Sequence, residues 1–167
     1  MKKLIGAFAL ALLISICLTS CGSQVPRPEV EEGRFNLTLT YEHNGEIKKL
    51  SGVYVCEYDG VAWWDINADP YVNWKTHLEG ALNTESVSVC TTEDGGEILI
   101  TLQLYPEYFM GDPECADFEP LVRAELFYYE GENGTISESF DDAELIAEYG
   151  VRVISFEYDE PIENVFE

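Results

Sequence analysis

The segment from Asp65 to Asn73 places oxygen-bearing side chains at every second position. Asp65, Asn67 and Asp69 are followed by Tyr71, which can offer its backbone carbonyl, and then by Asn73. Carboxylate, amide and carbonyl oxygens are the ligands that Ca²⁺ takes, roughly six to eight at a time. The first chemistry to consider is therefore a calcium site, with Asp65, Asn67 and Asp69 as its metal-ligating candidates.

This segment resembles an EF-hand loop, and within that family the dockerins of extracellular cellulosomal proteins. Ile66-Asn67 and Val72-Asn73 stand where dockerins carry an aliphatic residue with asparagine and a Val-Asn pair. The chain departs from the pattern at Pro70, where the loop needs glycine for a sharp turn, and at Thr76, where it needs an acidic ligand. The second dockerin motif is absent. A calcium-binding module therefore remains an alternative function.

A second acidic segment offers a candidate calcium site that does not follow the EF-hand pattern, and the sequence supports it no better than the first. Its candidate ligands are Asp112, Glu114, Asp117 and Glu119.

Aromatic side chains are the other candidate contact groups, and they gather in two segments. Flat rings beside carboxylates suit glycan or peptide ligands, because rings stack on apolar faces while acids accept hydrogen bonds. The alternative is that both segments pack back onto the sheet as core anchors. We expect Trp63 or Trp64 to share an exposed concave patch with Tyr108 or Phe109. The full set of candidate ligand-binding residues is Trp63, Trp64, Trp74, Tyr108 and Phe109.

Catalytic signatures are absent from the sequence. It contains no G-x-S-x-G elbow, no H-E-x-x-H, no phosphate-binding loop and no dinucleotide fingerprint, and its two histidines are His43 and His77. We therefore expect no cofactor and a non-catalytic protein. The alternative is a small extracellular hydrolase, which would need two carboxylates facing each other across a cleft, one of them desolvated. With 32 acidic residues, the sequence does not single out such a pair.

The first 21 residues predict export. Lys2 and Lys3 precede an apolar run from Leu4 to Leu18, the arrangement of a secretory signal peptide in residues 1–20. The end of this run, Leu18 to Cys21, resembles the lipobox of bacterial lipoproteins. That resemblance implies a diacylglyceryl group on Cys21, a membrane partner through this lipid anchor, and location at the extracytoplasmic face of the cell membrane. The alternative is ordinary cleavage that leaves Cys21 as a plain thiol.

Removal of residues 1–20 from the 167-residue chain leaves 147 residues, which suits one domain. Residues 21–33 are polar, contain two prolines and predict a tether, and residues 34–167 predict a single β-rich domain. The mature chain also loses two positive charges, so its formal charge goes from −23 to −25. Such a surface repels nucleic acid. The remaining candidate partners are a glycan, a peptide or a basic protein. The alternative is that the acidic surface serves solubility alone.

The cysteines do not predict a zinc site, because the chain has no C-x-x-C pair. Cys56, Cys90 and Cys115 remain once Cys17 is removed and Cys21 is lipidated. Cys56 and Cys90 both lie in strong strand patterns, so a disulfide between them is predicted. Free or buried thiols are the alternative, since pairing cannot be deduced from sequence.

Alternating apolar and polar residues predict antiparallel strands. Residues 35–42 lead through Asn44-Gly45, a type I′ turn signal, into residues 47–58. Asp59-Gly60 predicts another tight turn into a third strand at residues 61–66, which would complete a meander.

The later part of the chain predicts two further hairpins, a helix and a last strand. The hairpins join 86–90 to 97–105 and 126–129 to 135–140, and the strand covers 151–158. The helix covers 141–149, because Asp141 and Glu144 have capping-box spacing and Gly150 ends it. The fold class is therefore mainly β, an antiparallel sandwich or barrel-like sheet with one short helix near the C-terminus.

Overall fold

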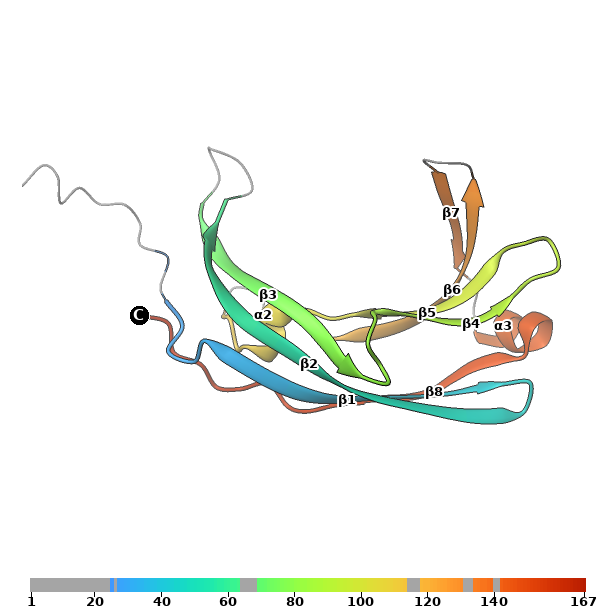
Figure 1. Ribbon diagram of the computed structural model, residues 1–167, viewed down its shortest axis with the longest axis horizontal. Helices are drawn as coiled ribbons and strands as arrows, with labels where there is room; N and C mark the ends of the chain where they lie inside the picture. Colours follow the sequence, from blue (N-terminus) through green and yellow to red (C-terminus); the bar gives the residue numbers. More distant parts are fainter. Residues whose placement is uncertain (1–24, 26, 64–68, 114–117, 131–133, 140–141) are drawn as a thin grey trace, which may run out of the picture.

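The computed structural model describes residues 25, 27–63, 69–113, 118–130, 134–139 and 142–167. These residues form two four-stranded antiparallel sheets that lie one over the other (Figure 1). The predicted mainly β, sandwich-like fold is confirmed. In the first sheet, the order β3-β2-β1-β8 joins Tyr71–Gly80, Glu46–Ala62, Glu32–His43 and Val151–Tyr158. In the second, the order β4-β5-β6-β7 joins Ser86–Thr91, Glu97–Gln103, Leu121–Glu130 and Gly134–Ser139.

The β1–β2 hairpin is the longest pairing and matches its prediction. All twelve residues of β1 pair with β2 without a break, from Glu32 opposite Glu57 to His43 opposite Glu46. Asn44 and Gly45 have φ angles of 53° and 82°, as a type I′ turn requires. The two-residue turn therefore sets the register, and the register decides which side chains face the core.

The first three strands form the predicted meander, but its second turn was misplaced. Asp59-Gly60 does not reverse the chain: β2 continues to Ala62, and its pairing with β3 shifts between Tyr58 and Val61. Gly60 has a φ of 86°, so the Asp-Gly pair forms a bulge within the strand. The third strand is therefore Tyr71–Gly80. Of the residues predicted to form it, 61 and 62 belong to β2, and 64–66 lie outside the described residues.

The remaining predicted elements are confirmed, with one addition. Both later hairpins pair in antiparallel fashion, and the helix, α3, covers Asp142–Tyr149, with Gly150 at a φ of 62° after it. The addition is α2, a single turn at Pro106–Phe109 that begins with proline, where its missing N–H costs nothing.

The core lies between the two sheets and follows from the alternation of β1. Phe35, Leu37 and Leu39 are at most 2% exposed and face Ile100 and Leu102 of β5 within one buried cluster. Each such side chain contributes about 1.5–3 kcal/mol when it is fully buried. A second, smaller cluster centres on Leu145 of α3 and fixes the helix against the sheets.

The two ends of the described chain are paired with each other. Arg27 and Glu167 exchange both backbone hydrogen bonds, at 2.7 and 3.0 Å, and Glu29 N donates to Val165 O at 2.8 Å. We call residues 27–31 and 162–167 the clasp. Glu32 and Gly33 already belong to β1. The predicted tether boundary at residue 33 is therefore too late, because the C-terminal segment supplies pairing partners that no local pattern reveals.

A chain that begins at residue 34 lacks half of the clasp and the start of β1. We expect its free energy of unfolding to be about 2–4 kcal/mol lower than that of a chain beginning at residue 25, because each hydrogen bond lost contributes about 1 kcal/mol. Urea denaturation followed by circular dichroism measures the difference. A chain ending at residue 161 removes the other half of the clasp and should lose a similar amount. Equal midpoints for all three chains would contradict a structural role for the clasp.

Candidate functional site

The aromatic residues predicted to form one exposed patch are divided between core and surface. Trp74 is 8% exposed and Phe109 is fully buried, so neither side chain belongs to an exposed patch. Trp74 alternates inward on β3 with Val72, while Phe109 of α2 lies 4.8 Å from the ring of Phe35 and 5.3 Å from that of Tyr54. The helical turn missing from the sequence prediction is what directs Phe109 into the core.

The other candidates occupy different places. Tyr108 is half-buried, its ring 6.1 Å from that of Tyr158, and burial raises its pKa to about 12. Trp63 is 58% exposed just after β2, and Trp64 lies outside the described residues. The exposed ring in the second aromatic segment is Phe118, which lies 5.5 Å from Tyr105. Thus Tyr108 and Phe109 do not join Trp63 in one exposed patch.

The described part of the predicted calcium loop does not have EF-hand geometry. Residues Tyr71–Gly80, which would supply the second half of an EF-hand loop and the following helical residues, form β3 and pair with β2. Pro70 explains the difference, since it disfavours helical geometry at the preceding Asp69. Asp65 and Asn67 lie outside the described residues, as do Glu114 and Asp117 of the second acidic segment. Among the residues that the structure describes, no group of three or more histidine, cysteine or acidic residues is placed to hold a metal.

The predicted disulfide between Cys56 and Cys90 is not formed, and both residues are free thiols. Cys56 lies opposite Gly33 near one end of β1, whereas Cys90 lines a cleft beside His43 at the other end. Ten residues of strand separate Gly33 from His43, or about 33 Å. A disulfide requires Cα atoms about 5.5 Å apart.

A buried polar group lies on the inner face of the first sheet. The hydroxyl of Tyr54 forms side-chain hydrogen bonds with Cys56, two residues along β2, and with Thr76 of β3. Burial raises the pKa of Tyr54 and raises that of Cys56 to about 12. Both groups therefore stay protonated near neutral pH and satisfy each other's hydrogen bonds inside the core.

Two carboxyl groups lie close together at α2. Asp112 is 6% exposed, and its backbone N donates to the carbonyl oxygen of Glu107 at 2.8 Å. Burial raises the pKa of Glu107, and the charge of Asp112 adds to the rise. A raised carboxyl pKa is one property of a general acid, which the hydrolase alternative requires. Neither group lines the two clefts described next, so the pair gives that alternative little support.

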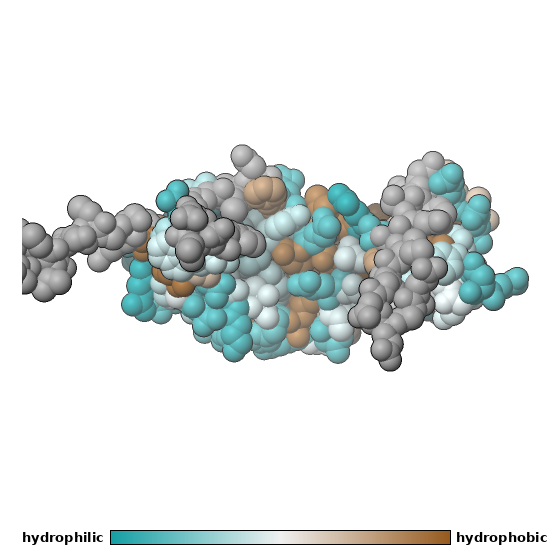
Figure 2. Space-filling view, turned by 90° about the horizontal axis from the view of Figure 1, so that it is seen from above, coloured by the Kyte–Doolittle hydropathy of each residue, from teal (hydrophilic) through white to brown (hydrophobic). Residues whose placement is uncertain are grey.

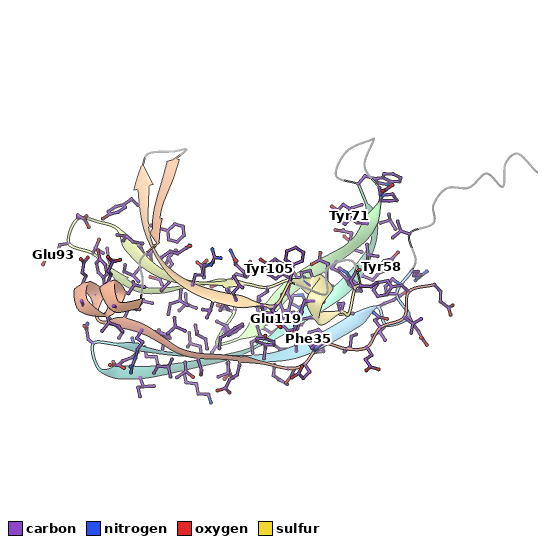
Figure 3. All side chains as sticks on the ribbon, turned by 180° about the vertical axis from the view of Figure 1, so that it is seen from behind. Phe35, Tyr58, Tyr71, Glu93, Tyr105 and Glu119 are labelled. Atoms are coloured by element: carbon purple, nitrogen blue, oxygen red, sulfur yellow. The ribbon has the colours of Figure 1, made fainter. Side chains whose placement is uncertain are left out.

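An open cleft of about 620 Å³ lies at the end of the sandwich opposite the clasp. We call it the turn-end cleft, because the β1–β2 turn, the β4–β5 turn and the C-terminal part of α3 form its walls. Figure 3 shows Glu93 beside α3 at this end and Tyr58 at the other. The lining residues are His43, Asn44, Cys90, Thr91, Thr92, Glu93, Ile146, Ala147, Glu148, Tyr149 and Gly150.

Hydrogen bonds hold two walls of the turn-end cleft in place. In the β4–β5 turn, Thr92 N donates to Gly96 O at 2.8 Å, and Asp94 accepts from the hydroxyls of Thr92 and Tyr128 at 2.5 and 2.7 Å. These two hydroxyls lower the pKa of Asp94, which therefore stays ionised as the centre of the turn. Between the other walls, Asn44 N donates to Gly150 O at 2.9 Å.

The rim of the turn-end cleft is acidic. Glu93 and Glu148 contribute carboxylates from two different walls, and the described lining includes neither lysine nor arginine. Ile146, 45% exposed, adds an apolar surface beside them. This arrangement can accept hydrogen bonds and ion pairs from a cationic group while contacting an apolar neighbour of that group.

A second cleft, of about 350 Å³, lies at the clasp end, and we call it the clasp-end cleft. Lys75 is 3.9 Å from Glu57, and Arg27, whose guanidinium lies 5.5 Å from the centre of the Tyr58 ring, pairs with Glu31. Part of the acidic charge of this cleft is therefore already paired. Its lining residues are Glu31, Glu32, Glu57, Tyr58, Asp59 and Lys75.

Sequence reasoning missed the turn-end cleft, although each of its parts was predicted. Asn44-Gly45, the Asp94 turn and the end of the helix at Gly150 were all located correctly. In an antiparallel sandwich such turns must lie at one end or the other, but the sequence does not say which turns share an end.

Comparisons with known proteins give no relative. No family model, no curated protein and no solved structure matches this chain. Within the described residues, no helix is long and apolar enough to cross a membrane.

The two described thiols should differ in reactivity. At pH 8, iodoacetamide should modify Cys90 in the folded protein, because Cys90 is partly exposed, and should leave Cys56 unmodified until the protein is denatured. Mass spectrometry of tryptic peptides reports both sites. If Cys56 and Cys90 formed a disulfide, neither would be modified in denaturant without a reductant, and that result would contradict the structure.

Proposed function

We propose that the protein is a lipid-anchored lipoprotein of the bacterial envelope that acts by non-catalytic binding. The signal and lipobox pattern of residues 1–21 supports attachment through Cys21 at the extracytoplasmic face of the cell membrane. The clasp supports it as well, because Arg27, which pairs with Glu167, follows Cys21 by six residues, at most about 20 Å of extended chain.

The single observation that carries the binding proposal is the turn-end cleft. It is open and acidic, and its β4–β5 wall is held in one shape before any ligand arrives. A rigid wall reduces the entropy lost on binding. The proposed ligand is a peptide segment of a partner protein that carries lysine or arginine beside an apolar side chain. Its cationic group pairs with Glu93 and Glu148, and its apolar side chain contacts Ile146.

The position of the cleft suits this role at a membrane. The twelve residues of β1 span about 40 Å between the clasp and the turn-end cleft. An anchor at the clasp end leaves the opposite end free to meet a partner. The excess of acidic residues, which gives the mature chain a formal charge of −25, would also steer a basic partner toward the protein.

A glycan remains the second candidate ligand, because Phe118 is 54% exposed and lies 5.5 Å from Tyr105. Figure 3 shows Tyr105 on the upper surface of the second sheet, and Figure 2 shows hydrophobic residues near the middle of that face with hydrophilic ones around them. Rings of this kind stack on the apolar faces of sugars. A thermal-shift screen would separate the two candidates, since a specific ligand raises the melting temperature.

Lipid attachment has its own test. The Cys21→Ser chain should lose the membrane fraction and the incorporation of labelled palmitate that the unaltered chain shows in a bacterial host. Cys90→Ser is the matched control and should keep both. Equal palmitate incorporation by the Cys21→Ser chain would refute the anchor.

Binding at the turn-end cleft can be measured with a fluorescent lysine-rich peptide. Replacing Glu93 and Glu148 by lysine should weaken binding about tenfold or more, because each lost ion pair contributes up to about 1 kcal/mol and the new charges repel the ligand. Replacing Glu119 and Glu160 by lysine changes the net charge equally outside the cleft and should weaken binding less than about threefold. Equal losses in the two double variants would show attraction by net charge alone.

A further inference from the structure

Exposed hydrophobic side chains are concentrated at the clasp end. Among the described residues, eight large hydrophobic side chains are exposed, and four of them lie at this end. Val30 and Val165 belong to the clasp, and Val61 and Trp63 lie at the end of β2 and just beyond it. Trp63 is the largest of the eight, with 58% of its surface in solvent. We call these four residues the clasp-end patch.

The clasp and the end of β2 are connected directly. Tyr58 N of β2 donates a hydrogen bond to Glu31 O at 2.7 Å, and Arg27 lies over the Tyr58 ring. Trp63 follows Tyr58 by five residues, about 16 Å along an extended strand. Figures 1 and 3, drawn from opposite sides, both place the end of β2 at the same end of the sandwich as the start of β1.

We propose that the clasp-end patch contacts the bilayer interface, with Trp63 as its main contact. This inference rests on the proposed lipid anchor. Residues 22–26 separate Cys21 from the clasp, so Arg27 stays within about 20 Å of the lipid-bearing Cys21 and Trp63 within about 40 Å. Such a short connection gives the patch a millimolar effective concentration at the membrane, and a weak intrinsic affinity then suffices. Tryptophan suits this position because its ring is apolar and its N–H polar.

The charges at the same end determine which bilayer the patch fits. Glu31, Glu32, Glu57 and Asp59 line the clasp-end cleft, and the pairing of Arg27 with Glu31 and of Lys75 with Glu57 offsets only part of their charge. Anionic headgroups would repel these carboxylates at low ionic strength. The patch therefore fits a zwitterionic interface of phosphatidylcholine or phosphatidylethanolamine, and its contact weakens as the fraction of anionic lipid rises.

The test uses the lipidated protein extracted from membranes and reconstituted into phosphatidylcholine vesicles with brominated acyl chains near the headgroups. Bromine quenches tryptophan that reaches the interface. We expect the bromolipids to quench the tryptophan fluorescence of the wild-type protein, and we expect this quenching to be at least halved in Trp63→Phe. Quenching of the wild-type protein should also decrease as phosphatidylglycerol is added. Ile47→Trp in the Trp63→Phe background places an exposed indole at the turn end, which should add no quenching to that of the Trp63→Phe protein.

Three results would overturn the contact. The fluorescence of the wild-type and Trp63→Phe proteins could be quenched equally, or the tryptophan introduced at position 47 could be quenched as strongly as Trp63. Trp63 could also be shielded from iodide by a second copy of the chain, in detergent-free solution and without vesicles. The mass of the Cys21 peptide is measured in the same samples. Absence of the lipid refutes the anchor, whereas absence of quenching in protein whose Cys21 carries the lipid refutes only the contact.

Discussion

The unbroken pairing of β1 with β2 is the constraint on which the rest of the structure depends. Asn44-Gly45 fixes this register, and a shift of one residue would turn Phe35, Leu37 and Leu39 from the core to solvent. β8 and β3 then pair on either side of this hairpin, and the second sheet covers the face that it buries. Both ends of the molecule follow from its length, because the clasp closes one end and the turn-end cleft opens at the other.

Much of the fold could be predicted from the sequence, because local patterns determine it. Asn44-Gly45 gave the first hairpin, and the helix beginning at Asp142 and ending before Gly150 had clear local signals. Asp59-Gly60 was misleading, since the same two residue types that make a tight turn also make a bulge within a long strand. Only the partner strand decides between these outcomes, and its position is not a local property.

The candidate site was harder to predict because it depends on contacts between distant segments. Phe109 and Trp74 have the composition expected of a ligand surface, yet α2 and the alternation of β3 direct them inward. Cys56 and Cys90 both lie in strands, but at opposite ends of the sandwich. The turn-end cleft joins three turns that are up to about a hundred residues apart in the chain. Residue type alone does not contain this information.

The clasp also determines how the protein bears a mechanical load. A pull on the proposed N-terminal anchor would reach the domain through Arg27 and would load its backbone bonds to Glu167. Glu167 would therefore be part of the attachment point, although it lies 140 residues away in sequence. A reporter domain fused after Glu167 would pull on the pairing of Arg27 with Glu167 and would lie beside the proposed anchor. A reporter inserted at the Asn44-Gly45 turn would lie at the far end of the molecule.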